Sequence, residues 1–293
     1  MKNIGYRILN FPLTRIVIGF VFVVGLFNLS QAFLSKVLYQ TPLGREFFYL
    51  CIGIVPAALA VLSYLFLYRF YEKRKVTELS VNRIGRDLAL GVLLGAVLQS
   101  LTIGVIYLKG GFVVESVNSF LFVIPGLTMA FSTAVLEELL LRGIVFRIME
   151  EKLGSYLALA LSALLFGLMH LANPHSSFVA SLGIAIQAGL LLGIAYIYTR
   201  KLWFPIAIHF AWNFTQAGIF GANVSGGSLS KSLLNTKITG AEWFTGGAFG
   251  PEGSVQATLF CLCASLVLFV LCRKYNKMIK PFWIRNQQRL IKA

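Results

Sequence analysis

The sequence is poor in charged residues, and poorest in acidic ones. Only 13% of its 293 residues are charged, with 11 Asp and Glu in all, while 57% are hydrophobic. Soluble domains contain about 25% charged and about 45–50% apolar residues, so this composition excludes an ordinary soluble domain and a disordered chain. Cysteine is scarce too, and four cysteines dispersed along the chain exclude a disulfide framework. The composition predicts an integral membrane protein.

The hydrophobic residues gather into runs that approach the roughly 20 residues a membrane-spanning helix needs. Such runs are expected at residues 13–33, 48–70, 88–108, 120–141, 156–171, 178–198, 203–220 and 255–272. The sequence therefore predicts an all-α fold, a polytopic membrane helical bundle with about eight transmembrane helices. Two pairs of glycines with GxxxG spacing predict close helix packing: Gly91 with Gly95, and Gly189 with Gly193.

The basic residues are distributed unevenly between the predicted loops. Of 26 Lys and Arg residues, 20 fall on the side of the two termini, from Lys2 onward, and five on the other side, while Arg142 lies within a span. Because cytoplasmic loops collect Lys and Arg, this distribution predicts a multi-pass protein with both termini in the cytoplasm. The net charge of +15 is then explained by topology and by membrane lipid as a partner, and no nucleic acid is expected.

The longest connection, residues 221–253, is rich in glycine and falls on the non-cytoplasmic side. One interpretation is a flexible loop that rests at the membrane interface through Trp243 and Phe244. The other is a lid that contacts a substrate, since long loops without their own secondary structure are often functional. The sequence leaves both interpretations open.

Three of the apolar runs contain polar groups that are costly in lipid and therefore indicate a functional site. They are Glu137, Glu138 and Arg142 in the fourth run, His170 at the end of the fifth, and His209 with Asn213 in the seventh. A single buried histidine or asparagine is more often a packing residue. Because three separate runs each carry such groups, we expect them to converge near the middle of the membrane.

The spacing of these residues indicates their roles. Glu138 and Arg142 are four residues apart, so they can pair on one helix face, either as structural support or as part of a site. Glu137 is rotated by about 100° from Glu138 and must point elsewhere, as a carboxyl available for general base catalysis. His209 and Asn213 are again four apart, so both can donate hydrogen bonds in one direction.

Together these groups can hydrolyse a peptide bond without a covalent intermediate. Glu137 with His170 would activate a water, and His209 with Asn213 would stabilise the oxyanion. A zinc site built from Glu and two His is an alternative, but HExxH is absent and Arg142 beside the carboxylates disfavours a cation, so neither a metal nor another cofactor is expected. Proton relay in a channel or carrier is a further alternative.

The three motifs Glu137-Glu138-xxx-Arg142, Phe166-xxx-His170 and His209-xxx-Asn213, in this order on separate spans, resemble the CAAX prenyl endopeptidase type II family. This family includes the Ras-converting endopeptidases and the bacterial CAAX protease and bacteriocin-processing (Abi) proteins. The resemblance covers residues 121–220. It implies a metal-independent intramembrane glutamic endopeptidase in which the first Glu and the second-motif His activate water, the third-motif His and Asn form the oxyanion hole, and the remaining motif residues, Glu138, Arg142 and Phe166, support the site.

The predicted spans divide the chain into three parts, and the resemblance, which does not extend to the first three spans or the Gly-rich loop, implies a substrate class. Residues 1–118 would hold three transmembrane helices and a basic cytoplasmic loop, and 119–220 a catalytic core of four transmembrane helices. Residues 221–293 would hold the Gly-rich extracytoplasmic loop, the last transmembrane helix and a basic cytoplasmic tail. The expected partner is a peptide or protein substrate, prenylated or otherwise membrane-associated, and the expected location is the bacterial plasma membrane. The alternative is a non-catalytic bacteriocin-immunity or partner-binding membrane protein of the same fold.

Overall fold

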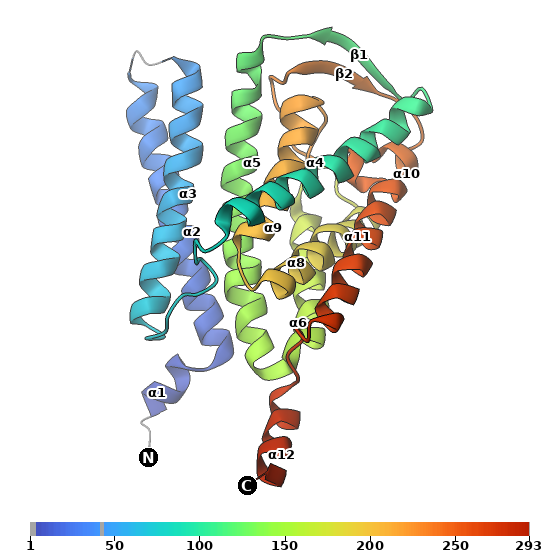
Figure 1. Cartoon of the computed structure of the whole chain (residues 1–293). Helices are drawn as coiled ribbons and strands as arrows, with labels where there is room; N and C mark the ends of the chain where they lie inside the picture. The colour runs from blue at the N-terminus through green and yellow to red at the C-terminus, as the bar shows by residue number, and fades with distance from the viewer. Residues whose placement is uncertain (1–3, 42–43, 293) are drawn as a thin grey trace.

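The computed structural model describes residues 4–41 and 44–292. Its first and last helices, α1 (Ile4–Leu9) and α12 (Phe282–Lys292), lie at the same end of a helical bundle (Figure 1). Lys2, which was counted among the basic residues on that side, lies outside the described residues. The long helices run between this end and an opposite end that carries a small two-stranded sheet.

Two long helices form one side of the bundle, and a third crosses its face. α2 (Pro12–Tyr39) and α3 (Arg45–Phe70) lie side by side, and α4 (Ile84–Leu108) runs obliquely across the helices that follow (Figure 1). Pro12 opens α2, a position where the missing N–H of proline removes no helical hydrogen bond. α3 ends at Phe70 and α4 ends at Leu108, which are the ends that the hydropathy predicts for the second and third apolar runs.

The middle of the chain forms a continuous helical path interrupted by wider π-helical turns. In order, its elements are η1 (Phe120–Phe122), α5 (Val123–Glu138), the π-helix η2 (Leu139–Phe146), α6 (Arg147–Met169), η3 (His170–Ala172), α7 (Phe178–Ile184), the π-helix η4 (Ala185–Leu190), α8 (Leu191–Thr199), α9 (Trp203–Asn213) and the π-helix η5 (Phe214–Ile219). Gly154, with φ of 73°, breaks the helix within α6, so the chain reverses there. The last elements are α10 (Glu242–Thr245), η6 (Pro251–Gly253) and α11 (Val255–Lys274).

Six helices in the described part of the chain are long and apolar enough to cross a membrane. This confirms an all-α polytopic bundle, whereas the expected number of eight is not confirmed. Residues 120–172 count as one helix of 53 residues, although Gly154 divides them into the predicted fourth and fifth spans. α9 with η5 falls just short of the 18 residues required.

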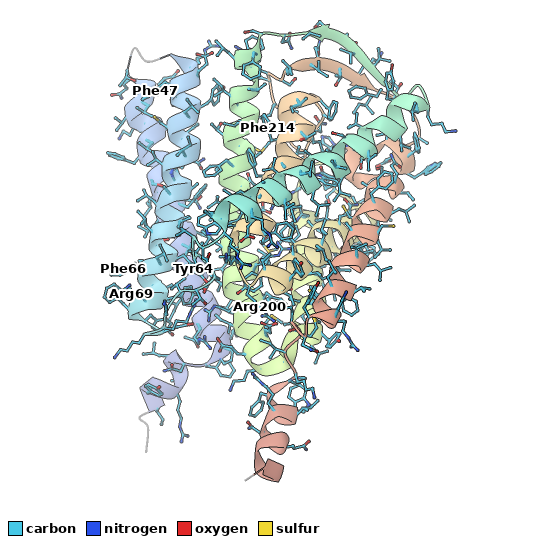
Figure 2. All side chains as sticks on the ribbon, in the orientation of Figure 1. Phe47, Tyr64, Phe66, Arg69, Arg200 and Phe214 are labelled. Carbon is cyan, nitrogen blue, oxygen red and sulfur yellow. The ribbon has the colours of Figure 1, made fainter. Side chains whose placement is uncertain are left out.

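The surface of the bundle is apolar where lipid would contact it. Phe47 and Phe66 on α3 point away from the bundle and are 50% and 57% exposed, while Tyr64 on the same helix points inward and is fully buried (Figure 2). Similar exposed Leu, Val and Phe side chains line α2, α4 and α11. Such an exterior is expected for a protein whose solvent is a bilayer.

Glycines allow α4 to lie directly against α9. A Cβ atom at Gly91 would come within 2.8 Å of the carbonyl oxygen of Phe204, and one at Gly95 within 2.2 Å of the carbonyl oxygen of Ile208. The second glycine pair packs closely as well, because a Cβ at Gly189 would meet the backbone of Ala163 at 2.8 Å. The close packing expected from the GxxxG spacing is confirmed, and it fixes the helix that carries His209.

The Gly-rich connection folds against the bundle instead of extending freely. Its strand β2 (Leu234–Ile238) pairs antiparallel with β1 (Phe112–Val117), from Phe112 opposite Ile238 to Val117 opposite Leu234. Neither strand was predicted from the sequence. Trp243 is 65% exposed, whereas Phe244 packs into a small apolar cluster under the sheet. The loop is therefore anchored to the bundle between its glycine pairs, through β2 and Phe244.

An ion-pair cluster joins helices at the end where the termini lie. Glu72, just after α3, contacts Arg15 of α2 at 2.7 Å and Arg147 of α6 at 3.0 Å. Burial opposes the ionisation of Glu72, but the adjacent Arg147 and Arg15 guanidinium groups outweigh it and lower the pKa of this carboxyl. The cluster holds the α2–α3 pair onto the rest of the bundle.

Candidate active site

Glu138 lies at the centre of the polar residues predicted to converge. It is fully buried, and Arg142 donates a hydrogen bond of 2.7 Å to its Oε1 atom, which confirms the predicted i,i+4 pair. Arg142 also donates to the carbonyl oxygen of Ala188 and stacks over the ring of Phe166, 4.8 Å from its centroid. A buried ion pair needs such additional partners, although Oε2 of Glu138 has none among the described residues.

His209 lies between the two glutamates. Its Nδ1 atom is 3.0 Å from Oε1 of Glu138, and its Nε2 atom is 3.9 Å from Oε2 of Glu137. Because an ionised carboxylate can only accept a hydrogen bond, Nδ1 of His209 carries the hydrogen and donates the hydrogen bond to Glu138. This bond fixes the plane of the ring and turns Nε2 towards Glu137.

Glu137 points away from Arg142, as its rotation on the helix predicts. Its side chain is 26% exposed and lines a groove with Gln31 of α2 and Tyr49 of α3. The Oε2 atom is buried without a hydrogen-bond partner among the described residues. The predicted partner of Glu137 was His170, but among the described residues no contact joins these two, and Glu137 lies instead next to His209.

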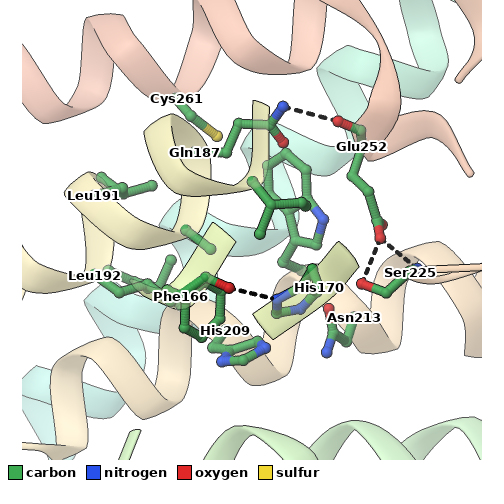
Figure 3. Close-up of a pocket in the computed structure, with 14 residues that line it drawn as sticks. Phe166, His170, Gln187, Leu191, Leu192, His209, Asn213, Ser225, Glu252 and Cys261 are labelled. Atoms are coloured by element: carbon green, nitrogen blue, oxygen red, sulfur yellow. Dashed lines mark hydrogen bonds between the residues drawn. The ribbon is translucent and has the colours of Figure 1, made fainter. Parts of the chain in front are cut away.

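His170 begins the short helix η3 at the end of α6. Its Nδ1 atom lies 2.8 Å from the carbonyl oxygen of Phe166, one turn earlier (Figure 3). A carbonyl oxygen can only accept, so Nδ1 carries the proton and the lone pair of a neutral ring lies on Nε2. The two histidines therefore differ: the carboxylate of Glu138 orients His209, and a neutral carbonyl orients His170.

A pocket brings His170, His209 and Asn213 together. Figure 3 shows the two histidines and the amide of Asn213 around one space between α6, η4 and α9. Most of the other walls are apolar and come from Ile184, Leu191, Leu192, Ile208, Trp212 and Cys261. Predicted polar residues of the fifth and seventh spans thus share one pocket, and those of the fourth span meet it only through the contacts of Glu137 and Glu138 with His209.

The Gly-rich loop adds residues to this pocket that the sequence reasoning missed. Glu252, in η6 at the end of the loop, accepts hydrogen bonds through Oε1 from the backbone N–H and the hydroxyl of Ser225. Its Oε2 atom accepts from the amide of Gln216. Glu252 and Ser225 both line the pocket (Figure 3). The available signal was a lone carboxyl between Gly250 and Gly253, immediately before an apolar run.

Burial changes the protonation of Glu252. Its side chain is almost completely removed from solvent, which raises the pKa of the carboxyl to about 7 even though the bonds from Ser225 and Gln216 oppose the shift. A carboxyl with this pKa exchanges its proton near neutral pH. The pocket therefore holds a titrating group on its loop side.

Each of the three π-helical segments adjoins a residue of the site. η2 begins directly after Glu138, η4 contains Gln187, which lines the pocket, and η5 begins directly after Asn213. Wide π turns are rare and frequently mark functional positions. Nothing in the residue pattern of these segments distinguished them from α-helix, so the sequence could not predict them.

The described residues include no group of three or more His, Cys, Asp or Glu side chains placed to hold a metal ion. Glu137, Glu138 and His209 are close, but Glu138 and His209 already bond to each other, and the guanidinium of Arg142 occupies the same carboxylate oxygen. The arrangement instead offers a ring nitrogen that accepts and an amide around one pocket, and a carboxyl, that of Glu137, which lines a separate groove 3.9 Å from His209. This set can activate water and stabilise an anion.

Residues 118–215 match the family described as Type II CAAX prenyl endopeptidase Rce1-like. The match covers about a third of the chain and includes every residue of the three motifs, from Glu137 to Asn213. It confirms the resemblance predicted from those motifs. No curated protein and no solved structure matches the chain.

Proposed function

We propose that the chain is an intramembrane endopeptidase, starting from the match of residues 118–215 to the type II CAAX prenyl endopeptidases. The observation that carries this proposal is that the two pocket histidines donate from Nδ1 to different acceptors. His170 is bonded to a carbonyl and leaves Nε2 as an acceptor, while His209 is bonded to a carboxylate through Nδ1. One ring suits the activation of water, and the other suits the donation of a proton.

In this mechanism Glu137 is the general base. A water held by the free Nε2 of His170 loses its proton to the unpartnered carboxylate of Glu137 and attacks the carbonyl carbon of the substrate. The structure gives no contact between these two residues, so the proposal requires the water and the substrate to bridge them. The separation of 3.9 Å between Glu137 and Nε2 of His209 is longer than a hydrogen bond and can be bridged by a shared oxygen atom.

His209 and Asn213 stabilise the oxyanion that forms. Carboxylates face both nitrogens of His209, so its ring can hold a proton on each, and Nε2–H can donate to the oxyanion together with the amide of Asn213. When the C–N bond breaks, Glu137 delivers the proton it took from water to the leaving amine. The products are a carboxylic acid and an amine, and Glu137 is restored. Glu138, Arg142 and Phe166 hold His209 in place.

The first experiment compares the wild-type chain with Glu137→Gln and His170→Ala in detergent. The substrates are a farnesylated CaaX peptide and a pool of unprenylated peptides, each with and without phenanthroline. We expect each variant to lose at least about 100-fold in cleavage rate, the usual contribution of a general base, without loss of folded protein. Glu46→Gln, in the first turn of α3 and outside both cavities, is the matched control.

The outcomes separate the alternatives. Cleavage that persists in Glu137→Gln contradicts the assigned base, and cleavage that phenanthroline abolishes indicates a metal enzyme. If the folded wild-type chain cleaves no peptide, the alternative of a non-catalytic immunity or partner-binding protein is favoured. Preference for the farnesylated peptide would establish a prenylated substrate, which we propose together with a bacterial plasma membrane location and cytoplasmic termini.

A further inference from the structure

Gln187, in the π-helix η4, is held in a single orientation in the wall of the pocket. Its side chain is 3% exposed, and its Nε2 atom donates to the backbone carbonyl of Glu252 at 2.8 Å (Figure 3). The same atom also donates to the hydroxyl of Thr258 at 2.7 Å. Both atoms accept, so a flipped amide would place oxygen against oxygen at Glu252. The side-chain oxygen must therefore point away from the loop.

This oxygen has no partner within the described chain. Oε1 of Gln187 is buried and accepts no hydrogen bond from any described residue, although the side chain lines the same pocket as His170, His209 and Asn213. Buried acceptors without a donor are rare in native proteins because desolvation is then uncompensated. A rigidly held, unpaired acceptor in a pocket indicates that a ligand supplies the donor.

The composition of the pocket identifies the class of donor. His209 and Asn213 offer hydrogen-bond donors for a carbonyl oxygen, and Gln187 offers a neutral acceptor within the same apolar space. A peptide backbone carries a carbonyl oxygen and an N–H group at short, fixed spacing. The carboxylate of Glu252 would be the group to bind a cationic ligand, but both of its oxygens already accept hydrogen bonds from Ser225 and Gln216. A cationic ligand is therefore disfavoured.

We propose that Gln187 is a substrate-anchoring residue that accepts a hydrogen bond from a backbone N–H of the peptide next to the cleaved bond. The identity of the ligand as a peptide rests on the proposed function. Glu252 and Thr258 are positioning residues, because their oxygen atoms fix the amide of Gln187. The site thereby distinguishes an amide backbone from an ester backbone, which has an oxygen in place of the N–H.

The test measures peptide binding to the Glu137→Gln chain in detergent, so that no cleavage is needed. The probe is the tightest-binding member of the farnesylated CaaX peptide and the unprenylated pool, synthesised also with each backbone N–H near the cleavage position replaced by an ester oxygen. We expect one such replacement to weaken binding by about tenfold, since a lost hydrogen bond leaves Gln187 unpaired. In the Gln187→Met background the same replacement should change binding by less than about twofold.

Gln99→Met is the matched control. Gln99 of α4 is also fully buried with both amide atoms unpartnered, but it does not line the pocket, so the tenfold ester effect should persist in this variant. Thr258→Val, which removes one of the two acceptors of Gln187, should reduce the ester effect partially and provides the test if Gln187→Met does not fold.

Three results overturn the anchoring site. The first is an ester effect of equal size in the Glu137→Gln chain with and without Gln187→Met. The others are no ester effect in the chain that retains Gln187, and no peptide binding by the folded chain. Failure of the proposed function is a separate result, in which the wild-type chain binds the peptide with the Gln187-dependent ester effect but does not cleave it. Cleavage without an ester effect would leave the endopeptidase in place and remove the anchor.

Discussion

At the residue scale, the site is organised around a carboxylate whose expected role was support. Glu138 bonds to Arg142 on its own helix path and to His209 on α9 through the same oxygen atom. Glu137, the expected base, keeps an unpaired oxygen because it is turned towards a different cavity. Adjacent glutamates on a helix thus have different environments: each keeps one buried oxygen without a partner among the described residues, but only Glu138 pairs with Arg142.

Replacing Glu138 by Gln should destabilise the chain more than removing both partners of its ion pair. The single change leaves the buried charge of Arg142 uncompensated, a loss of about 3–5 kcal/mol. The double variant Glu138→Gln, Arg142→Met removes both charges and should recover part of this stability. Thermal unfolding of the three proteins in detergent gives the comparison, and a double variant less stable than the single one contradicts it.

Glu252 should make stability depend on pH near neutrality. Its pKa is raised by burial from 4.5 to about 7, so the folded state binds a proton more tightly than the unfolded state. The resulting stabilisation is complete below about pH 4.5 and disappears as the pH rises through about 7. The unfolding temperature should fall over this range in the wild type.

The variant Glu252→Gln isolates this effect, because His209, the titratable group that acts on Glu252 across the pocket, is unchanged in it. The difference in unfolding temperature between wild type and variant should shrink or reverse from pH 5 to pH 7.5. A constant difference would show that Glu252 does not titrate in this range.

At the scale of elements, close approaches of helices place the site. α9 carries His209 and Asn213, and it reaches its position because glycines of α4 leave no side chain between the two backbones. α5 approaches η5 in the same way, where a Cβ at Gly126 would come within 2.4 Å of the Cα of Gly218. π turns follow directly after Glu138 and after Asn213.

Two glycines of α4 provide a matched pair of substitutions. In Gly95→Ala the new Cβ would lie 2.2 Å from the carbonyl oxygen of Ile208, next to His209, whereas at Gly104 no atom lies within 4 Å. We expect Gly95→Ala to lower stability by about 1–3 kcal/mol through overpacking and to reduce cleavage. Gly104→Ala should raise stability by about 0.5–1 kcal/mol and leave cleavage unchanged.

Unfolding temperature and cleavage rate of both variants form the test of this packing. Equal behaviour of Gly95→Ala and Gly104→Ala would contradict the placement of α9 against α4. A loss of cleavage in Gly95→Ala without a loss of stability would also be informative, because it would show that His209 moves while the helices stay packed.

At the scale of the whole molecule, the predicted distribution of basic residues agrees with the arrangement of the elements at the two ends of the bundle. α1 and α12 lie at one end of the bundle together with the Glu72 ion-pair cluster, and the sheet and the Gly-rich loop lie at the other (Figure 1). By the sequence-based count, 20 of the 26 Lys and Arg residues belong to the loops and tails at the end that carries α1 and α12. The pocket receives Ser225 and Glu252 from the opposite end, so the loop forms one of its walls.

Fusion of alkaline phosphatase, which is active only outside the cytoplasm, should report this orientation. A fusion within residues 239–241, after β2, should be active, and a fusion after residue 293 should be inactive. The physical reason is that 20 of 26 basic residues lie on the terminal side and resist translocation. Phosphatase activity of the C-terminal fusion would reverse the topology.

The sequence by itself determined that the chain lies in a lipid bilayer, that its fold is all-α, and that Glu138 pairs with Arg142. Long apolar runs have no stable alternative to helices in lipid, and the i,i+4 spacing of Glu138 and Arg142 requires only one helix. The three motifs were sufficient to identify the resemblance, because each buried polar group is conspicuous in an apolar run.

Only the tertiary structure decided which groups face one another. His209 contacts Glu138, Glu252 enters the pocket from a distant loop, and Gln187 is fixed by the backbone of η6. These contacts depend on helix crossings, π turns and the anchoring of residues 221–253 to β1. Their geometry is set by interactions between residues far apart in the chain, so no local spacing contains it.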